Sequence, residues 1–181
     1  MIDRAYCVLM ATYGHWQNEQ LLAACGRLGD ADRKKSDGAF FGSIHGTLNH
    51  LIYGDLSWMS RFEANETAPI DPGDEFFKDF NELWSARRLL DTRILNWAGQ
   101  IEEAWLAAPF RYVSRISGKA YERRAWQLVV HMFNHQTHHR GQLTDQLARL
   151  GVDYGITDLP AMPELGAPSD TSPRLRGEVV P

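Results

Sequence analysis

Four of the seven histidines of this 181-residue chain lie within nine residues, at positions 131, 135, 138 and 139. His135 and His139 are four positions apart, so on a helix their imidazoles stack on one face and can chelate a single divalent ion. Neutral imidazole is the commonest side-chain ligand of transition metals. The spacing resembles the HExxH pair of zinc proteases, but Gln136 stands where their general base would be. The pair is therefore a candidate metal site without that proteolytic chemistry.

A helical wheel divides these four histidines into two pairs. At about 100° per residue, one arc of the wheel is apolar and should face the protein interior. The residues that define this arc are Leu128, Met132, Leu143, Leu147 and Leu150. His139 falls inside the arc and His135 on its edge, whereas His131 and His138 fall outside it. Two imidazoles on an inner face destabilise the fold unless something pairs with them. The alternative is that both are ordinary polar residues at a helix edge.

A metal site needs a further ligand from another helix, and three histidines remain. His50 lies in the middle of a predicted helix, with Gly46 and Gly54 one turn away on either side to leave space. His45 is rotated about 140° from His50 and cannot share its face. His15 lies among polar residues and is expected at the surface or rim. The local sequence leaves two interpretations of His50 open, a metal ligand and a buried core histidine.

Hydrophobic periodicity predicts four helices. They cover residues 5–27, 43–65, 75–106 and 124–150, with Ser43 and Asp74 as the N-caps of the second and third. Residues 28–42 and 66–74 are predicted to be loops. Residues 109–124 alternate bulky and polar side chains around Ser117-Gly118-Lys119, which indicates a β-hairpin.

These elements predict an all-α protein. The expected fold is a four-helix bundle with a long crossover connection, containing a short β-hairpin, between the third and fourth helices. The bundle would span residues 1–155, and a Pro/Gly-rich C-terminal tail, partly mobile, would span 156–181. On the fourth helix, Trp126, Val130 and Phe133 form a second apolar strip, which either packs in the core or forms a homodimer surface.

Composition excludes several classes of protein. Hydrophobic residues are 44% and charged residues 23%, which is typical of a globular domain. The net charge of −4 lacks the basic footprint of a nucleic-acid-binding protein. No apolar run approaches the roughly 20 residues of a membrane helix, and the N-terminus lacks a signal peptide. We therefore expect a cytoplasmic protein, with Cys7 and Cys25 buried and reduced.

Two motifs together resemble the DinB family, within the DinB/YfiT-like metalloenzymes. They are SIHGTLNHLIYGDLSWMSRF at 43–62, with NHL followed by DxxW, and HMFNHQTHHRGQL at 131–143, with HxxxHRGQ. The resemblance covers roughly residues 5–155. It implies a four-helix bundle, often homodimeric, that holds a divalent metal with His50, His135 and His139. Some relatives are thiol-dependent S-transferases that use low-molecular-weight thiols, others resemble maleylpyruvate isomerases, and many have no assigned reaction.

Three neutral histidines would leave an open, catalytic-type site, and zinc or nickel suits such ligands. The ion would lower the pKa of a bound water or thiol. Gln142 follows His139 by three positions and either contacts a ligand or a residue behind His139, or is an ordinary solvated polar residue. Arg61 could meet a substrate anion at the end of the bundle, or lie on the surface. Arg140 is predicted to pair with Asp55 inside the bundle.

The sequence thus favours a metal-dependent enzyme of thiol-transferase type, with a low-molecular-weight thiol as one small-molecule substrate. The alternative is a non-catalytic dimer that binds a metal or small ligand, because no carboxylate is assigned as a general base. A third hypothesis is a structural dimer whose histidines are incidental. DNA binding is the weakest hypothesis, since there is neither a basic face nor a reading motif.

Overall fold

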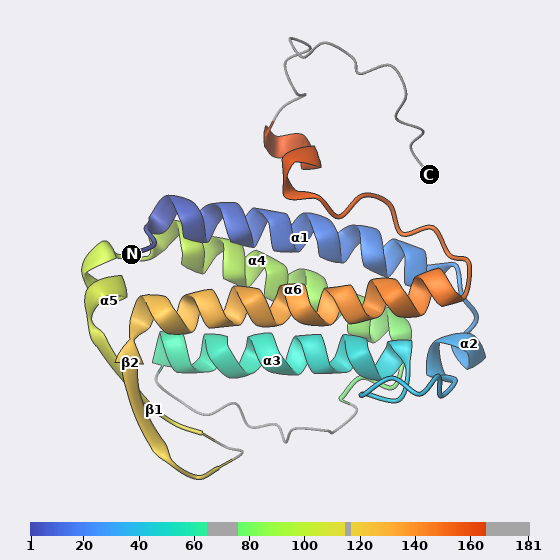
Figure 1. Cartoon of the computed structure of the whole chain (residues 1–181), viewed down its shortest axis with the longest axis horizontal. Coiled ribbons are helices and arrows are strands. Elements are labelled where there is room, and N and C mark those ends of the chain that lie inside the picture. The colour runs from blue at the N-terminus through green and yellow to red at the C-terminus, as the bar shows by residue number, and fades with distance from the viewer. Residues whose placement is uncertain (65–75, 115–116, 166–181) are drawn as a thin grey trace.

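The computed structural model describes residues 1–64, 76–114 and 117–165, and it is mostly helical (Figure 1). The four long helices are α1 (Arg4–Gly26), α3 (Ile44–Ala64), α4 (Phe80–Gln100) and α6 (Ala125–Arg149). The short elements are α2 (Asp30–Lys34), α5 (Glu103–Ala107), the strands β1 (Pro109–Val113) and β2 (Ala120–Arg124), and the 3-10 turns η1 (Leu159–Ala161) and η2 (Pro163–Leu165). The antiparallel hairpin β1–β2 lies between the third and fourth long helices, as predicted.

The long helices pack as one bundle in which α1 and α3 each contact both α4 and α6 (Figure 1). The N-terminal end of α4 lies beside the start of α3, because His45 Nε2 is 2.6 Å from the carbonyl oxygen of Phe77. Helices α3 and α4 therefore run in the same direction, and the chain must cross the length of the bundle between them.

The predicted place of the crossover is thus wrong. The connection that carries the hairpin joins α4 to α6 at one end of the bundle (Figure 1), whereas α3 ends at Ala64 at that end and α4 begins at Phe80 at the opposite end. Of the connection from α3 to α4, residues 65–75 lie outside the described part of the chain, and so does the predicted loop 66–74. Loop periodicity carries no signal for helix direction, so the sequence pattern could not distinguish the two connections.

Three of the four predicted helices agree with the structure to within one residue at each end. Ser43 acts as the predicted N-cap of α3, since its Oγ accepts the backbone N–H of Gly46 at 3.0 Å. Helix α6 ends before Gly151, whose φ of 68° is readily adopted by glycine. These boundaries are set by local chemistry, which is why periodicity and capping residues found them.

The third predicted helix is too long at both ends. Asp74, its predicted cap, lies outside the described residues, and the observed N-cap is Asp79, whose Oδ1 accepts two backbone N–H groups. Phe77 stays outside the helix because Asn49 and His45 of α3 bind its backbone groups. Beyond Gln100 the helix stops, and α5 forms as a separate turn. The short helix α2 also formed within the predicted loop 28–42.

The described part of the C-terminal tail lies along α1 (Figure 1). Tyr13 Oη donates to the carbonyl of Thr157 at 2.6 Å, and Gln17 Nε2 donates to that of Ile156 at 3.0 Å. Met162 is buried. Cys7 and Cys25 are free and buried, as predicted. Among the described residues, no helix is long and apolar enough to cross a membrane.

Candidate metal centre

Three histidines from two helices converge between α3 and α6. The Nε2 atom of His50 lies 3.2 Å from those of both His135 and His139, which are 3.1 Å from each other. Two nitrogens bound to one tetrahedral zinc ion at about 2.0–2.1 Å are about 3.3 Å apart. The three spacings therefore fit a single transition-metal ion, and these residues form a group that could hold one. We call His50, His135 and His139 the triad.

The protonation of the triad also suits a cation. Burial lowers the pKa of His50 to about 4 and that of His135 to about 3, and neighbouring histidines add to both shifts. Burial lowers the pKa of His139 as well. The imidazoles are therefore neutral near pH 7, which is the form that binds metals. Three close Nε2 atoms cannot all carry a proton, so lone pairs face the centre of the group.

Gln142 fixes the tautomer of one triad member. Its Oε1 lies 2.8 Å from His139 Nδ1, and an amide oxygen only accepts, so Nδ1 carries the proton and donates it. The lone pair of His139 is then on Nε2, toward the other two histidines. The amide nitrogen of Gln142 lies 3.3 Å from Nε2 of His138, which is exposed and outside the triad. A direct contact of Gln142 with a ligand stays a prediction.

Phe41 covers one side of the triad and was missed by the sequence analysis. Its ring stacks on His50 with centroids 3.8 Å apart and meets His139 edge-on at 5.2 Å. The segment that carries Phe41 is held because Gln146 of α6 donates to Asp37 at 2.8 Å. The available signal was the pair of phenylalanines in an otherwise polar loop.

Gly54 lets the two helices approach at the triad. A Cβ atom at this position would lie 2.4 Å from His135 Cε1 and 2.9 Å from its Nδ1. We therefore expect Gly54→Ala to displace His135 and to weaken Zn²⁺ binding about tenfold or more. Gly141→Ala is the matched control, because a Cβ on that glycine of α6 meets nothing within 4 Å. Isothermal titration with Zn²⁺ measures both, and equal affinities in the two variants would contradict this role.

The lowered pKa values also predict how the metal-free protein responds to acid. An unfolded histidine titrates near 6.5, above the folded pKa values of His50 and His135. Between these values the unfolded state binds more protons, so stability rises with pH. The stability that the neutral His50 and His135 contribute is fully present above about pH 6.5, and it is lost as pH falls toward 4 and then 3. Urea titrations with chelator at several pH values should show a shallower dependence in the double variant His50→Phe, His135→Phe. An unchanged dependence in that variant would be the contrary result.

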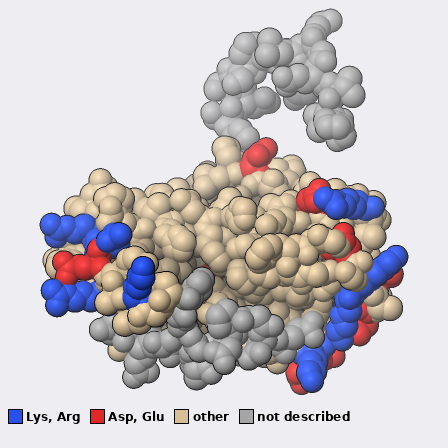
Figure 2. Space-filling model, turned by 60° about the horizontal axis from the view of Figure 1, so that its bottom comes forward, with Lys and Arg blue, Asp and Glu red and all other residues tan. Residues whose placement is uncertain are grey.

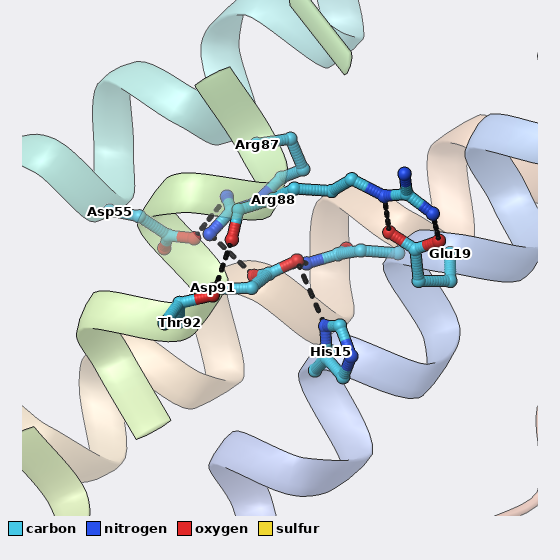
Figure 3. Close-up of polar contacts among 8 residues, drawn as sticks. His15, Glu19, Asp55, Arg87, Arg88, Asp91 and Thr92 are labelled. Carbon is cyan, nitrogen blue, oxygen red and sulfur yellow. Dashed lines mark hydrogen bonds and ion pairs between the residues drawn. The ribbon is translucent and has the colours of Figure 1, made fainter. Parts of the chain in front are cut away.

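A buried charge network lies beside the triad, between α3 and α4 (Figure 3). Arg87 NH1 donates to Asp55 Oδ2 at 2.6 Å, and Arg87 NH2 lies 2.7 Å from Asp91 Oδ1. Gln136, the neighbour of His135, donates to the other oxygen of Asp55 at 3.0 Å. The two carboxylates and the guanidinium are all buried. This network ties α3, α4 and α6 together next to the histidines.

The predicted pair between Arg140 and Asp55 is wrong. Arg87 and Gln136 occupy both oxygens of Asp55, and Arg140 instead lies over the ring of Tyr13, 5.3 Å from its centroid. Arg140 is buried on the α1 side of α6. Arg140 lies inside the bundle as predicted, but the partner of Asp55 comes from α4.

The remaining candidate residues, Arg61, His45 and His15, lie outside the triad. Arg61 is buried rather than on the surface, its NH1 donates to the carbonyl and the Oγ of Ser57, and it lies over the ring of Trp58. Its contact with a substrate stays a prediction. His45 is buried, and His15 is partly exposed at the rim, 3.7 Å from Asp91.

Core packing explains only part of the second apolar strip on α6, which consists of Trp126, Val130 and Phe133. Phe133 is fully buried, with Tyr6 against its edge at 6.2 Å. Trp126 and Val130 are half-buried. Phe133 therefore packs in the core, and the homodimer surface stays a prediction.

Comparison with known proteins identifies relatives. A family model described as the DinB family matches residues 1–171. A curated relative, Protein DinB of Bacillus subtilis (strain 168), is 25% identical over 155 residues, which are 80% of this chain and 88% of that protein. The match to the family extends over the whole triad and the helices that carry it.

Proposed function

This chain belongs to the DinB family, and on that premise we propose that it is a metal-dependent enzyme of thiol-transferase type. The observation that carries the proposal is the convergence of three neutral imidazoles, from two helices, at the spacing of ligands to one ion. Zinc or nickel is the proposed ion, because both suit imidazole ligands. The proposed ligands are His50, His135 and His139.

A divalent ion in this position would lower the pKa of a thiol, so that a thiolate is available near neutral pH. Three neutral ligands leave the charge of the ion uncompensated, which favours an anionic fourth ligand. Gln142 holds the proton on Nδ1 of His139, and Phe41 shields one side of His50 from water. In the part of the chain that the structure describes, no carboxylate bonds to the triad.

In the proposed reaction, the thiol sulfur forms a bond to an electrophilic carbon of the second substrate. The bond between that carbon and its leaving group breaks, and the leaving group departs with the bonding electrons. The thiol proton passes to solvent, because the triad offers no carboxylate to accept it. A transfer of this kind needs neither an oxidant nor a reductant.

Turnover measurements test this function. Purified protein loaded with Zn²⁺ or Ni²⁺ would be assayed with cysteine or glutathione and 1-chloro-2,4-dinitrobenzene. We expect metal-dependent product formation that chelator and His135→Ala abolish and that Gly141→Ala retains. Equal turnover in His135→Ala would contradict the proposal. Metal binding without turnover across a series of thiols would instead favour the non-catalytic binding protein.

We further propose a cytoplasmic homodimer. Trp126 and Val130 on α6 are half-buried, and Val8 on the neighbouring α1 is exposed, which gives these two packed helices apolar side chains at the surface. Light scattering after size exclusion tests this, with Val130→Glu as the variant expected to dissociate the dimer. A monomeric wild-type protein at tens of micromolar would rule it out.

A further inference from the structure

A row of rings continues from the triad toward the β-hairpin. From His135, the ring centroids are 6.2 Å to His131, then 5.2 Å to Trp58, 5.4 Å to Tyr112 and 5.6 Å to Tyr121. The row therefore joins α6, α3 and both strands, and one end of it is His135 of the triad. Of these rings, the proposed chemistry uses only that of His135. We call Trp58, Tyr112 and His131 the aromatic row.

The aromatic row is supported from behind. Phe62 is buried and stacks on Trp58 at 5.6 Å, and its ring also meets Phe110 of the hairpin at 5.8 Å. The guanidinium of Arg61 lies 5.3 Å from the Trp58 ring centroid and 6.0 Å from that of Tyr112. Trp58 and Tyr112 are therefore fixed in position by packing and by a cation behind them.

The other side of the aromatic row reaches solvent. Trp58 and Tyr112 are half-buried, and His131 is exposed. Core packing thus uses only part of each ring. The antiparallel register that pairs Tyr112 with Tyr121 stacks these two rings and extends the surface onto β2.

The stretches of α3 and α6 beside the aromatic row expose no charged side chain. Between residues 44 and 62 of α3 and between 125 and 144 of α6, the charged residues are Asp55, Arg61 and Arg140, which are 1%, 7% and 4% exposed. In the view of Figure 2, acidic and basic side chains gather toward the two ends of the molecule. The exposed charges nearest the row are on the hairpin, where Arg111 pairs with Glu122 and the Arg123 guanidinium lies 5.7 Å from the Tyr121 ring centroid. An anionic group at the row would lose water without gaining an exposed cation from these helices.

We propose that Trp58, Tyr112 and His131 form the subsite for an uncharged aromatic group of the second substrate. Its role in turnover rests on the proposed function, because a planar group on the row would place its neighbouring atoms beside His135. Its binding role stands separately, since stacking on aromatic faces needs no metal ion. In this proposal the aromatic row sets which electrophiles the site accepts, while an ion held by the triad would bind the thiol.

Two dyes with one ring system test the binding. N-phenyl-1-naphthylamine is uncharged, whereas 8-anilino-1-naphthalenesulfonate adds one sulfonate to the same rings. Fluorescence titration of wild-type protein should show about tenfold tighter binding of the uncharged dye. Trp58→Ala should weaken that binding about fivefold or more, and Trp58→Phe should keep most of it. Equal affinity for both dyes, or unchanged affinity in Trp58→Ala, would overturn the proposal.

Two control variants locate the dye. Trp84→Ala removes a half-buried tryptophan that packs against Gly26 near the start of α4, at the end of the bundle away from the hairpin, and it should leave dye binding unchanged. Leu89 is exposed and lines a separate groove of about 650 Å³ that includes Trp97 and Trp105. Leu89→Glu places a charge in that groove. If Leu89→Glu loses dye binding while Trp58→Ala keeps the wild-type affinity, the assignment of the dye to the aromatic row is overturned.

Kinetics separate this subsite from the function of the triad. Trp58→Ala should raise the KM for 1-chloro-2,4-dinitrobenzene, with the KM for the thiol and the metal content unchanged. His135→Ala should lose turnover but keep its affinity for the uncharged dye. If no metal supports turnover, the proposed function fails while the dye titration still decides the aromatic subsite. A rise in the KM for the thiol alone would count against it.

Discussion

Arg87→Leu should lower the free energy of unfolding by about 3–5 kcal/mol, because it leaves two carboxylates buried without their cation. Arg87 lies between Asp55 and Asp91 at 2.6 and 2.7 Å, and each of these carboxylates is at most 4% exposed (Figure 3). Gln136 and Asn18 supply hydrogen bonds to the carboxylates but no charge. Urea denaturation followed by circular dichroism measures the loss.

The neighbouring arginine is a matched control. Arg88 pairs with Glu19 at 2.6 Å, but its side chain is 60% exposed, so Arg88→Leu should change stability by about 0–1 kcal/mol. Adding Asp55→Asn and Asp91→Asn to Arg87→Leu should restore part of the loss, since the unpaired charges are then gone. Similar stabilities of Arg87→Leu and Arg88→Leu would contradict the importance of the buried network.

Zn²⁺ or Ni²⁺ should raise the melting temperature of the metal-free protein. A ligand at 100 times its Kd stabilises the folded state by about 2.7 kcal/mol. For a chain of this size, that corresponds to a rise of about 5–10 °C. His135→Ala should abolish the rise, because it removes one of the three converging nitrogens. Differential scanning fluorimetry with and without chelator checks the result.

His138→Ala is the control for that experiment. His138 lies on the same helix, three residues after His135, but it is exposed and outside the triad. Its ring meets that of His139 edge-on, with centroids 4.8 Å apart, and its Nε2 lies 3.3 Å from the amide nitrogen of Gln142. It supplies none of the three converging nitrogens, so the variant should keep most of the metal-induced rise. Equal losses in His135→Ala and His138→Ala would show that histidine content, and not the triad, binds the ion.

The sequence predicted those parts of the fold that local chemistry determines. Helices α1, α3 and α6 and the hairpin follow from periodicity, from the Ser43 cap and from alternation around Gly118. Helix α4 was misjudged because its start depends on a tertiary contact, in which His45 and Asn49 hold Phe77 outside the helix. The crossover was misplaced for a similar reason, since helix directions emerge only from packing.

The candidate site shows the same division. The wheel selected His135 and His139 because both lie toward the interior of one amphipathic helix, and the structure brings them to His50. Phe41 and Arg87 were not found, because their residue types carry no metal signal and their positions beside the triad and Asp55 depend on tertiary packing. Arg140 and Asp55 were paired on their opposite charges and their expected interior positions, whereas the actual cation comes from α4.

The metal content of purified protein tests the proposed centre most directly. Wild-type protein and the double variant His50→Ala, His135→Ala would each be incubated with excess Zn²⁺, dialysed and analysed by inductively coupled plasma mass spectrometry. Circular dichroism would first establish that the variant is folded. We expect about one ion per chain in the wild type and less than about a tenth of that in the variant. Equal zinc content in the two proteins would contradict the assignment of the triad as the metal site.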